Sequence, residues 1–299
     1  MDDVDLPGSS PQTQRHMAVE FSSECSARDV ANDDTLRSQL MRALIADVHD
    51  LASKPSAGIP RLILQFWDDA SAVPLDVQIC LDTWRALEDS GFERIVFDDV
   101  TARNFIADAL GSGATRAFDC CHHPAMRADY FRLCFMAERG GFYVDADDVY
   151  FGTPLEHLFE DDRLKLQPLC YDVATDSMVD PVSSAQAQGD SENGRTFYVN
   201  NNPIIAPPRH PVIRAALERA THQLLTTNVE SRDVQGLTGP GNLTAVLVEH
   251  ALDQSRAGHE FDFLLLKNWE STARSEWPLA YRSDARNWRQ WVRGEGGRL

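Results

Sequence analysis

The feature that most constrains the fold is a strand, a helix and a second strand in direct succession. Residues 61–67 (RLILQFW) and 94–97 (RIVF) are short apolar runs bounded by turn-forming or acidic residues, a pattern typical of buried strands. Between them, Val77, Leu81 and Trp84 lie on one face of a helix. Because parallel strands need a crossover of this kind, the order predicts an α/β fold with a mostly parallel central sheet flanked by helices.

The rest of the chain extends this pattern, and we expect residues 34–299 to form a single domain with its core at 59–277. Periodicity predicts helices over 34–51, 124–138, 211–225 and 243–252, and further strands over 142–145, 197–206 and 261–266. Residues 1–33 have no hydrophobic period and are expected to be a flexible acidic tail. Residues 172–195 are polar and aperiodic, which predicts a long loop, either a lid or an insertion. Residues 268–299 are rich in tryptophan.

Charge and composition exclude two kinds of partner. The net charge is -18, so a nucleic-acid backbone would meet repulsion on most faces, and we expect no nucleic-acid binding. No apolar run approaches the length of a membrane span, and the acidic start MDDVDLPGSS is unlike a secretory signal. We therefore expect no stable membrane insertion and a cytoplasmic location. The six cysteines lack CxxC spacing and are expected to be reduced thiols.

A cluster of carboxylates follows the strand expected at residues 142–145. Asp145, Asp147 and Asp148 stand close together in the sequence, directly after a glycine pair and three apolar or aromatic residues. Three carboxylates so close repel one another unless a cation or hydrogen-bond donors neutralise them, and Mg²⁺ or Mn²⁺ prefers such hard oxygen ligands. The cluster is therefore either a metal site or a solvated acidic turn.

The helix before this strand contributes a second pair of charged residues. Asp129 and Arg132 stand three positions apart and so share one helical face. They form either an exposed ion pair or a site in which the carboxylate binds hydroxyls and the guanidinium binds a phosphate of the same ligand. No GxSxG, GxxxxGK[ST] or HExxH motif occurs, which argues against a serine hydrolase elbow, a P-loop enzyme and a zincin.

Four blocks of the sequence resemble the DXD-containing sugar-binding family of glycosyltransferases. They are IPRLILQFW at residues 59–67, AMRADYFRLCFMAERGGFYVDADD at 125–148, NNPIIAPPRHP at 201–211 and TGPGNLT at 238–244. The blocks occur in the family's order, which is more specific than any one of them. The family includes yeast-type initiating mannosyltransferases and capsular polysaccharide transferases and, more distantly, the clostridial glucosylating toxins.

The resemblance implies a GT-A fold, a Rossmann-like sheet that binds a nucleotide-sugar at its strand ends, with Mn²⁺ or Mg²⁺ bridging the diphosphate. Asp147 would ligate the metal directly, with Asp145 and Asn268 as further metal ligands. Asp148 is extra to the family's motif and either assists the metal or faces water. Relatives commonly complete this site with a His or Glu near the C-terminus, whereas residues 267–277 (KNWESTARSEW) contain no His.

The resemblance also assigns roles toward the donor and in catalysis. Trp67 would stack on the nucleotide base, and Asp145 would bind hydroxyls of the ribose or the sugar. Asp129 and Arg132 would hold the donor sugar and help to neutralise the leaving diphosphate. The full donor-binding set is Trp67, Gln65, Asp129, Arg132, Asp145, Asn202, Ser275 and Trp277. The catalytic set is Asp129, Arg132, Asp145 and Asp147, and the neighbouring Asn200 and Asn201 leave the register of Asn202 open by one or two residues.

The function implied is a metal-dependent, retaining transfer of a sugar from a nucleoside-diphosphate sugar to a hydroxyl of an unknown acceptor. UDP-sugars are the first expectation and GDP-mannose the second, and the acceptor would be a glycan, a natural product or another small molecule. Three alternatives stay open. The acceptor could be a protein side chain, the chain could be a binding module without turnover, or the acids could serve a metal-dependent phosphohydrolase.

Overall fold

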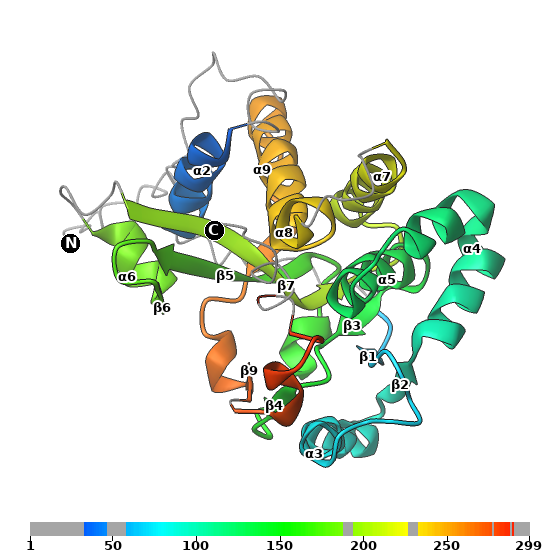
Figure 1. Ribbon diagram of the computed structural model, residues 1–299. Helices are drawn as coiled ribbons and strands as arrows, with labels where there is room; N and C mark the ends of the chain where they lie inside the picture. Colours follow the sequence, from blue (N-terminus) through cyan, green and yellow to red (C-terminus); the bar gives the residue numbers. More distant parts are fainter. Residues whose placement is uncertain are drawn as a thin grey trace, which may run out of the picture.

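A seven-stranded sheet forms the centre of the computed structural model, which describes residues 33–46, 58–187, 194–226, 233–276, 278–287 and 289. The strands lie in the order β2-β1-β3-β7-β5-β6, with β8 beside β5 (Figure 1). Their bounds are β1 Leu62–Phe66, β2 Glu93–Phe97, β3 Gly141–Tyr143, β5 Leu164–Asp172, β6 Ser177–Val179, β7 Arg195–Ala206 and β8 Phe263–Leu265. The pairings give β1, β2, β3, β5 and β8 one direction and β6 and β7 the other. The expected α/β class with a mostly parallel sheet is confirmed.

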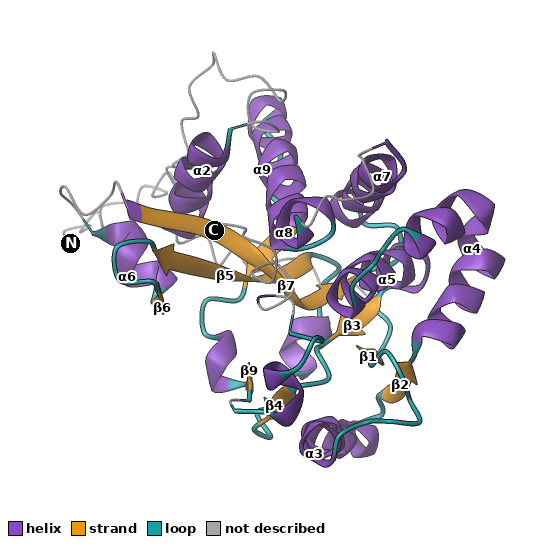
Figure 2. Ribbon diagram, viewed as in Figure 1, coloured by secondary structure: helices purple, strands orange, loops and turns teal. Residues whose placement is uncertain are grey.

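Helices and short 3-10 turns cover both faces of this sheet (Figure 2). On one face, Leu64 of β1 and Ile204 of β7 join the hydrophobic cluster of α5, α7 and α9. On the other, Ile63 and Ile205 pack with Trp84 and with η2 and η4. Because β1 has both faces covered, all five of its residues are buried, which explains its continuous apolar run. The helices are α2 Asp34–Ala46, α3 Leu75–Thr83, α4 Asp99–Asp119, α5 Pro124–Arg139, α6 Pro181–Gln186, α7 Pro211–Thr226, α8 Val234–Leu237 and α9 Pro240–Ala257, and the 3-10 turns are η1 Trp84–Ser90, η2 Glu156–Phe159, η4 Trp269–Ser271 and η5 Ala280–Ser283.

A separate two-stranded sheet joins the acidic cluster to the C-terminal part of the chain. It pairs β4 (Asp148–Tyr150) with β9 (Ala273–Ser275) in antiparallel register, and Asp148 stands opposite Ser275. The indole nitrogen of Trp84, which is fully buried, donates a hydrogen bond of 2.9 Å to the backbone oxygen of Asp148. The end of the acidic cluster is therefore fixed by contacts with two distant segments.

Most elements expected from periodicity are present, and one expectation is wrong. The expected helices and strands correspond to α2, α5, α7, α9, β1, β2, β3, β7 and β8. Their ends differ by a few residues from those expected, apart from the end of the helix expected over 34–51, whose residues 47–51 lie outside the described residues. Residues 172–187 do not form a loop, because β6 pairs with β5 and α6 follows it. Asp180 caps α6 by accepting a hydrogen bond from the Ser183 backbone N–H, and Pro181 occupies its first turn. Residues 188–193 and the expected tail at 1–32 lie outside the described residues.

No helix among the described residues is long and apolar enough to cross a membrane.

A glycine pair sets the approach of β3 to its neighbours. Gly140 and Gly141 have φ angles of 63° and 111°, a region that disfavours side chains. A Cβ on Gly141 would lie 2.6 Å from the carbonyl oxygen of Leu62, and one on Gly140 would lie 2.8 Å from the carbonyl oxygen of Ala206. The backbone of β3 therefore lies against two other chain segments with no room for side chains at these positions.

We predict that Gly141→Ala lowers the free energy of unfolding by at least about 2 kcal/mol, because the methyl group meets backbone that cannot give way. Gly113→Ala is the matched control, since a Cβ there has no atom within 4 Å and its φ is ordinary. It should raise stability by up to about 1 kcal/mol. Urea unfolding of both variants measures the difference, and similar values for the two would contradict the argument.

Candidate functional site

A cavity of about 1070 Å³ opens at the carboxyl ends of β1 and β3. The cavity is lined by Trp67, which directly follows β1, and by the three acids that follow β3. Helix α5 contributes Asp129 to the lining. Ligands of α/β sheets bind at such strand ends. The structure therefore brings the residues of the second sequence block into one cavity with residues of the third block and of the C-terminal part.

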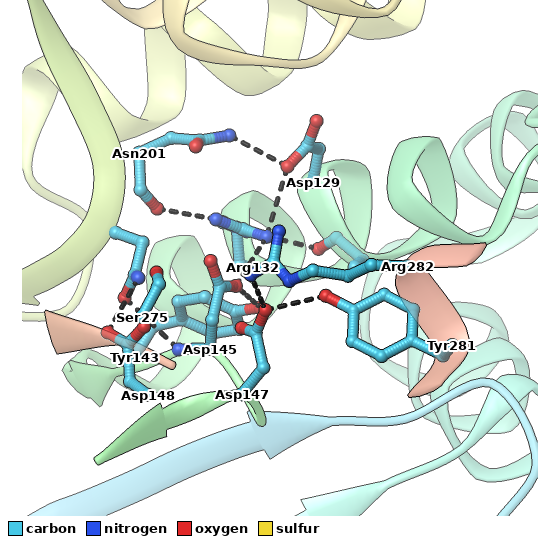
Figure 3. A network of polar contacts seen from close by, with 12 residues as sticks. Asp129, Arg132, Tyr143, Asp145, Asp147, Asp148, Asn201, Ser275, Tyr281 and Arg282 are labelled. Carbon is cyan, nitrogen blue, oxygen red and sulfur yellow. Dashed lines mark hydrogen bonds and ion pairs between the residues drawn. The ribbon is translucent and has the colours of Figure 1, made fainter. Parts of the chain in front are cut away.

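Arg132 holds the polar network of this cavity together (Figure 3). Its Nη2 lies 3.0 Å from Oδ1 of Asp129 and 3.0 Å from Oδ1 of Asp145, and its Nη1 donates a hydrogen bond of 2.7 Å to the backbone oxygen of Asn201. The guanidinium also stacks over the ring of Tyr143, with 4.1 Å to the centroid. Since its side chain is only 4% exposed, Arg132 joins α5, β7 and the end of β3 and has little contact with the open cavity.

Two of the acids after β3 are held by neutral donors as well. Asp145 accepts a hydrogen bond of 2.7 Å from the hydroxyl of Tyr143, and its side chain is 31% exposed. Asp148 is buried, and its two oxygens accept from the hydroxyl of Ser275 at 2.7 Å and from the side-chain amide of Asn202 at 2.8 Å. Asp148 therefore does not face water, and the carboxylate of Asp145 is more accessible than that of Asp148.

Asp147 contacts the C-terminal part of the chain. Its Oδ2 accepts a hydrogen bond of 2.6 Å from the hydroxyl of Tyr281 and forms an ion pair with Arg282 (Figure 3). The backbone oxygen of Asp147 accepts from the N–H of Glu276 at 2.9 Å. A cation is thus already placed against the carboxylate to which the family resemblance assigns the metal.

Burial raises the pKa of the carboxyl groups in this cavity. The pKa of Asp148 rises to about 8, because the group is buried and is repelled by Asp147 and Asp145. The pKa of Asp129 rises to about 6 through burial, although Arg132 opposes the shift. Burial and the charge of Asp145 also raise the pKa of Asp147. Added positive charge would favour the ionised forms, so the cluster is suited to receive a cation.

The donor set fits a hard divalent cation with few protein ligands. Within the described ranges, no three His, Cys, Asp or Glu side chains converge as a ready-made metal cage. Asp147 offers a carboxylate at the cavity, and Mg²⁺ and Mn²⁺ commonly use one or two carboxylates with waters and phosphates. Asn268, at the start of η4, is exposed and lines the same cavity, so it is available as a further oxygen ligand.

Trp67 lines the cavity, whereas Gln65 does not. Trp67 is 7% exposed. The centroid of the Tyr281 ring lies 5.2 Å from that of Trp67 in a T-shaped arrangement, and the guanidinium carbon of Arg286 lies 5.5 Å from the Trp67 ring centroid. Its indole nitrogen has no hydrogen-bond partner among the described residues. Gln65 is fully buried and accepts a hydrogen bond of 3.3 Å from Arg94, away from the cavity. The structure therefore gives no support to Gln65 as a donor-binding residue.

The structure resolves the register of the asparagines and adds residues that sequence reasoning missed. Asn201 donates 2.8 Å to Asp129, whereas Asn202 contacts the acidic cluster, its side-chain oxygen accepting from the N–H of Asp145 at 3.1 Å. Trp277 lies outside the described residues. Asn201 was considered only as an alternative register for Asn202, and the residues missed outright are Tyr143, Tyr281, Arg282 and Arg286. The only signal for the last three is the presence of several arginines in the tryptophan-rich C-terminal segment.

Comparisons with known proteins agree with these observations. Residues 74–164 match the model of the glycosyltransferase sugar-binding region containing the DXD motif. The chain is 24% identical over 230 residues, 68% of its length, to the initiation-specific alpha-1,6-mannosyltransferase of Schizosaccharomyces pombe, of which it covers 52%. It is 27% identical over 135 residues, 40% of its length, to inositol phosphoceramide mannosyltransferase 2 of the same organism, of which it covers 39%. The chain thus spans about half or less of the length of these relatives.

Among solved structures, the PaToxG glycosyltransferase aligns over 90% of this chain and 96% of its own, with 16% identity and a TM-score of 0.45. The residues matched by the family model include Asp145, Asp147 and Asp148, the acidic cluster that lines the cavity. The family match over residues 74–164 confirms the resemblance to the DXD-containing glycosyltransferases for this part of the chain.

Proposed function

We propose that the chain is a metal-dependent glycosyltransferase that moves a sugar from a nucleoside-diphosphate sugar to an acceptor hydroxyl. The observation that carries this proposal is the cavity at the strand ends, in which Asp129 and Asp145 lie against the buried Arg132 and Asp147 lies beside them against Arg282. A cavity of about 1070 Å³ is large enough for a nucleotide-sugar and part of an acceptor. The family match and the two mannosyltransferase relatives support sugar transfer.

The proposed roles follow from where each side chain lies. Asp147 would hold the divalent cation, which supplies positive charge to the diphosphate as it leaves. Asp145 is the more exposed neighbour and would accept hydrogen bonds from hydroxyls of the donor or share the cation. Trp67, which lines the cavity, would stack on the base.

Asp129 and Arg132 act together in this proposal. Asp129 would bind hydroxyls of the transferred sugar, while Arg132 fixes the positions of Asp129 and Asp145. Because the Arg132 guanidinium already contacts two carboxylates and the backbone oxygen of Asn201, we assign it orientation of the two acids more than direct contact with phosphate. Its charge still stabilises a nearby diphosphate through space.

Donor, stereochemistry and acceptor are further parts of the proposal. Both relatives are named mannosyltransferases, which favours mannose and places GDP-mannose beside UDP-sugars among the donors to test. We propose retention by front-face displacement, in which the leaving phosphate takes the proton of the acceptor hydroxyl. The acceptor would be a hydroxyl of a glycan or another small molecule. A trapped glycosyl-enzyme would contradict the front-face route.

We predict that purified protein with Mn²⁺ consumes one donor from a panel of UDP-, GDP-, CDP- and TDP-sugars, and that EDTA abolishes this turnover. Asp147→Asn should reduce the rate at least about 100-fold, since it removes the negative charge that holds the cation. Asp253→Asn is the control: it removes an acid from the surface of α9, where the side chain is 65% exposed, and should stay within about 2-fold of wild type.

Released nucleotide measures the rate. Metal-dependent donor binding without any turnover, with or without candidate acceptors, would instead indicate a binding module. Release of phosphate from simple esters without sugar preference would indicate a phosphohydrolase. Labelled protein bands after incubation with labelled donor and lysate would move the acceptor to the protein class.

We further predict that Asp129→Asn abolishes donor turnover but raises the stability of the free protein at pH 7 by about 1 to 3 kcal/mol. The pKa of the Asp129 carboxyl group is about 6 in the folded protein, against an ordinary value of 3.8. The folded protein therefore binds the carboxyl proton more tightly than the unfolded chain does, which stabilises wild type at low pH. This stabilisation is lost as the pH rises through about 6. The amide does not titrate.

The advantage of Asp129→Asn over wild type should therefore be small at pH 4, grow toward pH 6 and level off above it. Urea unfolding at several pH values measures it. If Asp129→Asn is less stable than wild type at pH 7, the prediction is wrong, and the Asp129 carboxylate stabilises the fold in addition to any role in function.

A further inference from the structure

Residues 278–287, here named the C-terminal strap, contribute Tyr281, Arg282, Arg286 and Asn287 to the lining of the cavity. The strap is attached on one side by the backbone N–H of Ala280, which donates a hydrogen bond of 2.6 Å to Asp76 in α3. On the other side, the ring of His123 lies 3.0 Å from the backbone oxygen of Ala285. Between these attachments, Tyr281 and Arg282 reach Asp147 (Figure 3). The strap therefore brings a cation to the carboxylate expected to hold the metal.

The ion pair between Arg282 and Asp147 is largely removed from water. The two side chains are 14% and 12% exposed, so each charge depends on the other for neutralisation. The guanidinium meets the same oxygen, Oδ2, as the hydroxyl of Tyr281. Asp147 is in this state a carboxylate already satisfied by one cation and one neutral donor.

A divalent cation and the guanidinium compete for Asp147. Both carry positive charge, and two positive groups on one carboxylate in a partly buried site repel each other. Binding of the metal is therefore favoured by movement of Arg282 away from Oδ2. An arginine side chain has several rotatable bonds, so its guanidinium can reach another anion in the cavity without movement of the strap backbone.

A diphosphate is the anion that best suits this guanidinium. Arg132 is engaged with Asp129, Asp145 and Asn201. Of the other cations that line the cavity, Arg282 is the one that lies directly against Asp147, the carboxylate proposed to hold the metal. Guanidinium groups bind phosphate oxygens in a bidentate manner, and in a chain with a net charge of -18 an anionic ligand needs such a local cation.

We propose that Arg282 is a diphosphate-binding residue that neutralises Asp147 in the free enzyme and transfers to the phosphates of the donor when a divalent cation binds Asp147. The inference rests on the proposed function and adds to it a specific donor-binding residue. On this proposal, Arg282 has opposite effects on two binding affinities. Arg282 weakens binding of the metal alone and strengthens binding of a nucleoside diphosphate in the presence of the metal.

Arg282→Gln separates these effects. Titration with Mn²⁺ alone, followed by the electron paramagnetic resonance signal of free Mn²⁺, should show affinity about 5-fold higher than wild type, because the competitor is gone. Calorimetry with UDP and GDP at saturating Mn²⁺ should show affinity about 10-fold lower for the diphosphate that wild type binds. Arg282→Lys keeps the charge and should recover part of the diphosphate affinity.

Arg274→Gln is the matched control. Arg274 in β9 lines the same cavity and lies over the ring of Phe151, 5.5 Å from its centroid, so the variant makes the same change of charge away from Asp147. It should leave the Mn²⁺ affinity unchanged. Thermal unfolding of each variant confirms that it is folded.

The possible results divide clearly. A loss of both affinities in Arg282→Gln would assign Arg282 a structural role, and unchanged diphosphate affinity would show that it never reaches the phosphates. Either result overturns this proposal while the proposed function stands. If wild type binds neither UDP nor GDP with Mn²⁺, the proposed function itself fails and takes this inference with it.

Discussion

The buried contacts of Arg132 with Asp129, Asp145 and the backbone of Asn201 are the constraint on which the site depends. One guanidinium joins a helix, a strand and the loop after another strand, and it offsets part of the repulsion within a cluster of carboxylates. Without it, the pKa of Asp129, already raised to about 6 by burial, would rise further. The fold thus buries carboxylates whose ionisation lowers the stability of the ligand-free protein. Such a cost in stability is expected of groups that are retained for ligand binding.

Sequence reasoning reached the parts of the fold and site that local patterns encode. Buried strands read as apolar runs, and the three-residue spacing of Asp129 and Arg132 places both on the cavity side of α5. Alternation along a strand was harder to read, because adjacent Asn201 and Asn202 contact Asp129 and Asp148 respectively. Gln65 was misassigned because it lies inside β1 and is fully buried, whereas Trp67 follows the strand and lines the cavity.

Contacts between distant segments could not be predicted from patterns. Tyr281 and Arg282 meet Asp147 across 134 and 135 positions of the chain, and no periodicity encodes that pairing. Residues 172–187 were misassigned for another reason: their capping signal, Asp180 followed by Pro181, stands in a polar stretch whose composition suggests a loop. Tertiary pairing with β5 decides the structure there.

We propose that the acids of the cavity bind a divalent cation together with the diphosphate of a nucleotide. Anomalous diffraction from crystals grown with Mn²⁺ and UDP or GDP would locate that cation. We expect one Mn²⁺ peak bonded to an oxygen of Asp147 and to phosphate oxygens, with the base against Trp67. A nucleotide bound in the cavity without Mn²⁺ on Asp147, or Mn²⁺ bound only elsewhere, would overturn the proposal.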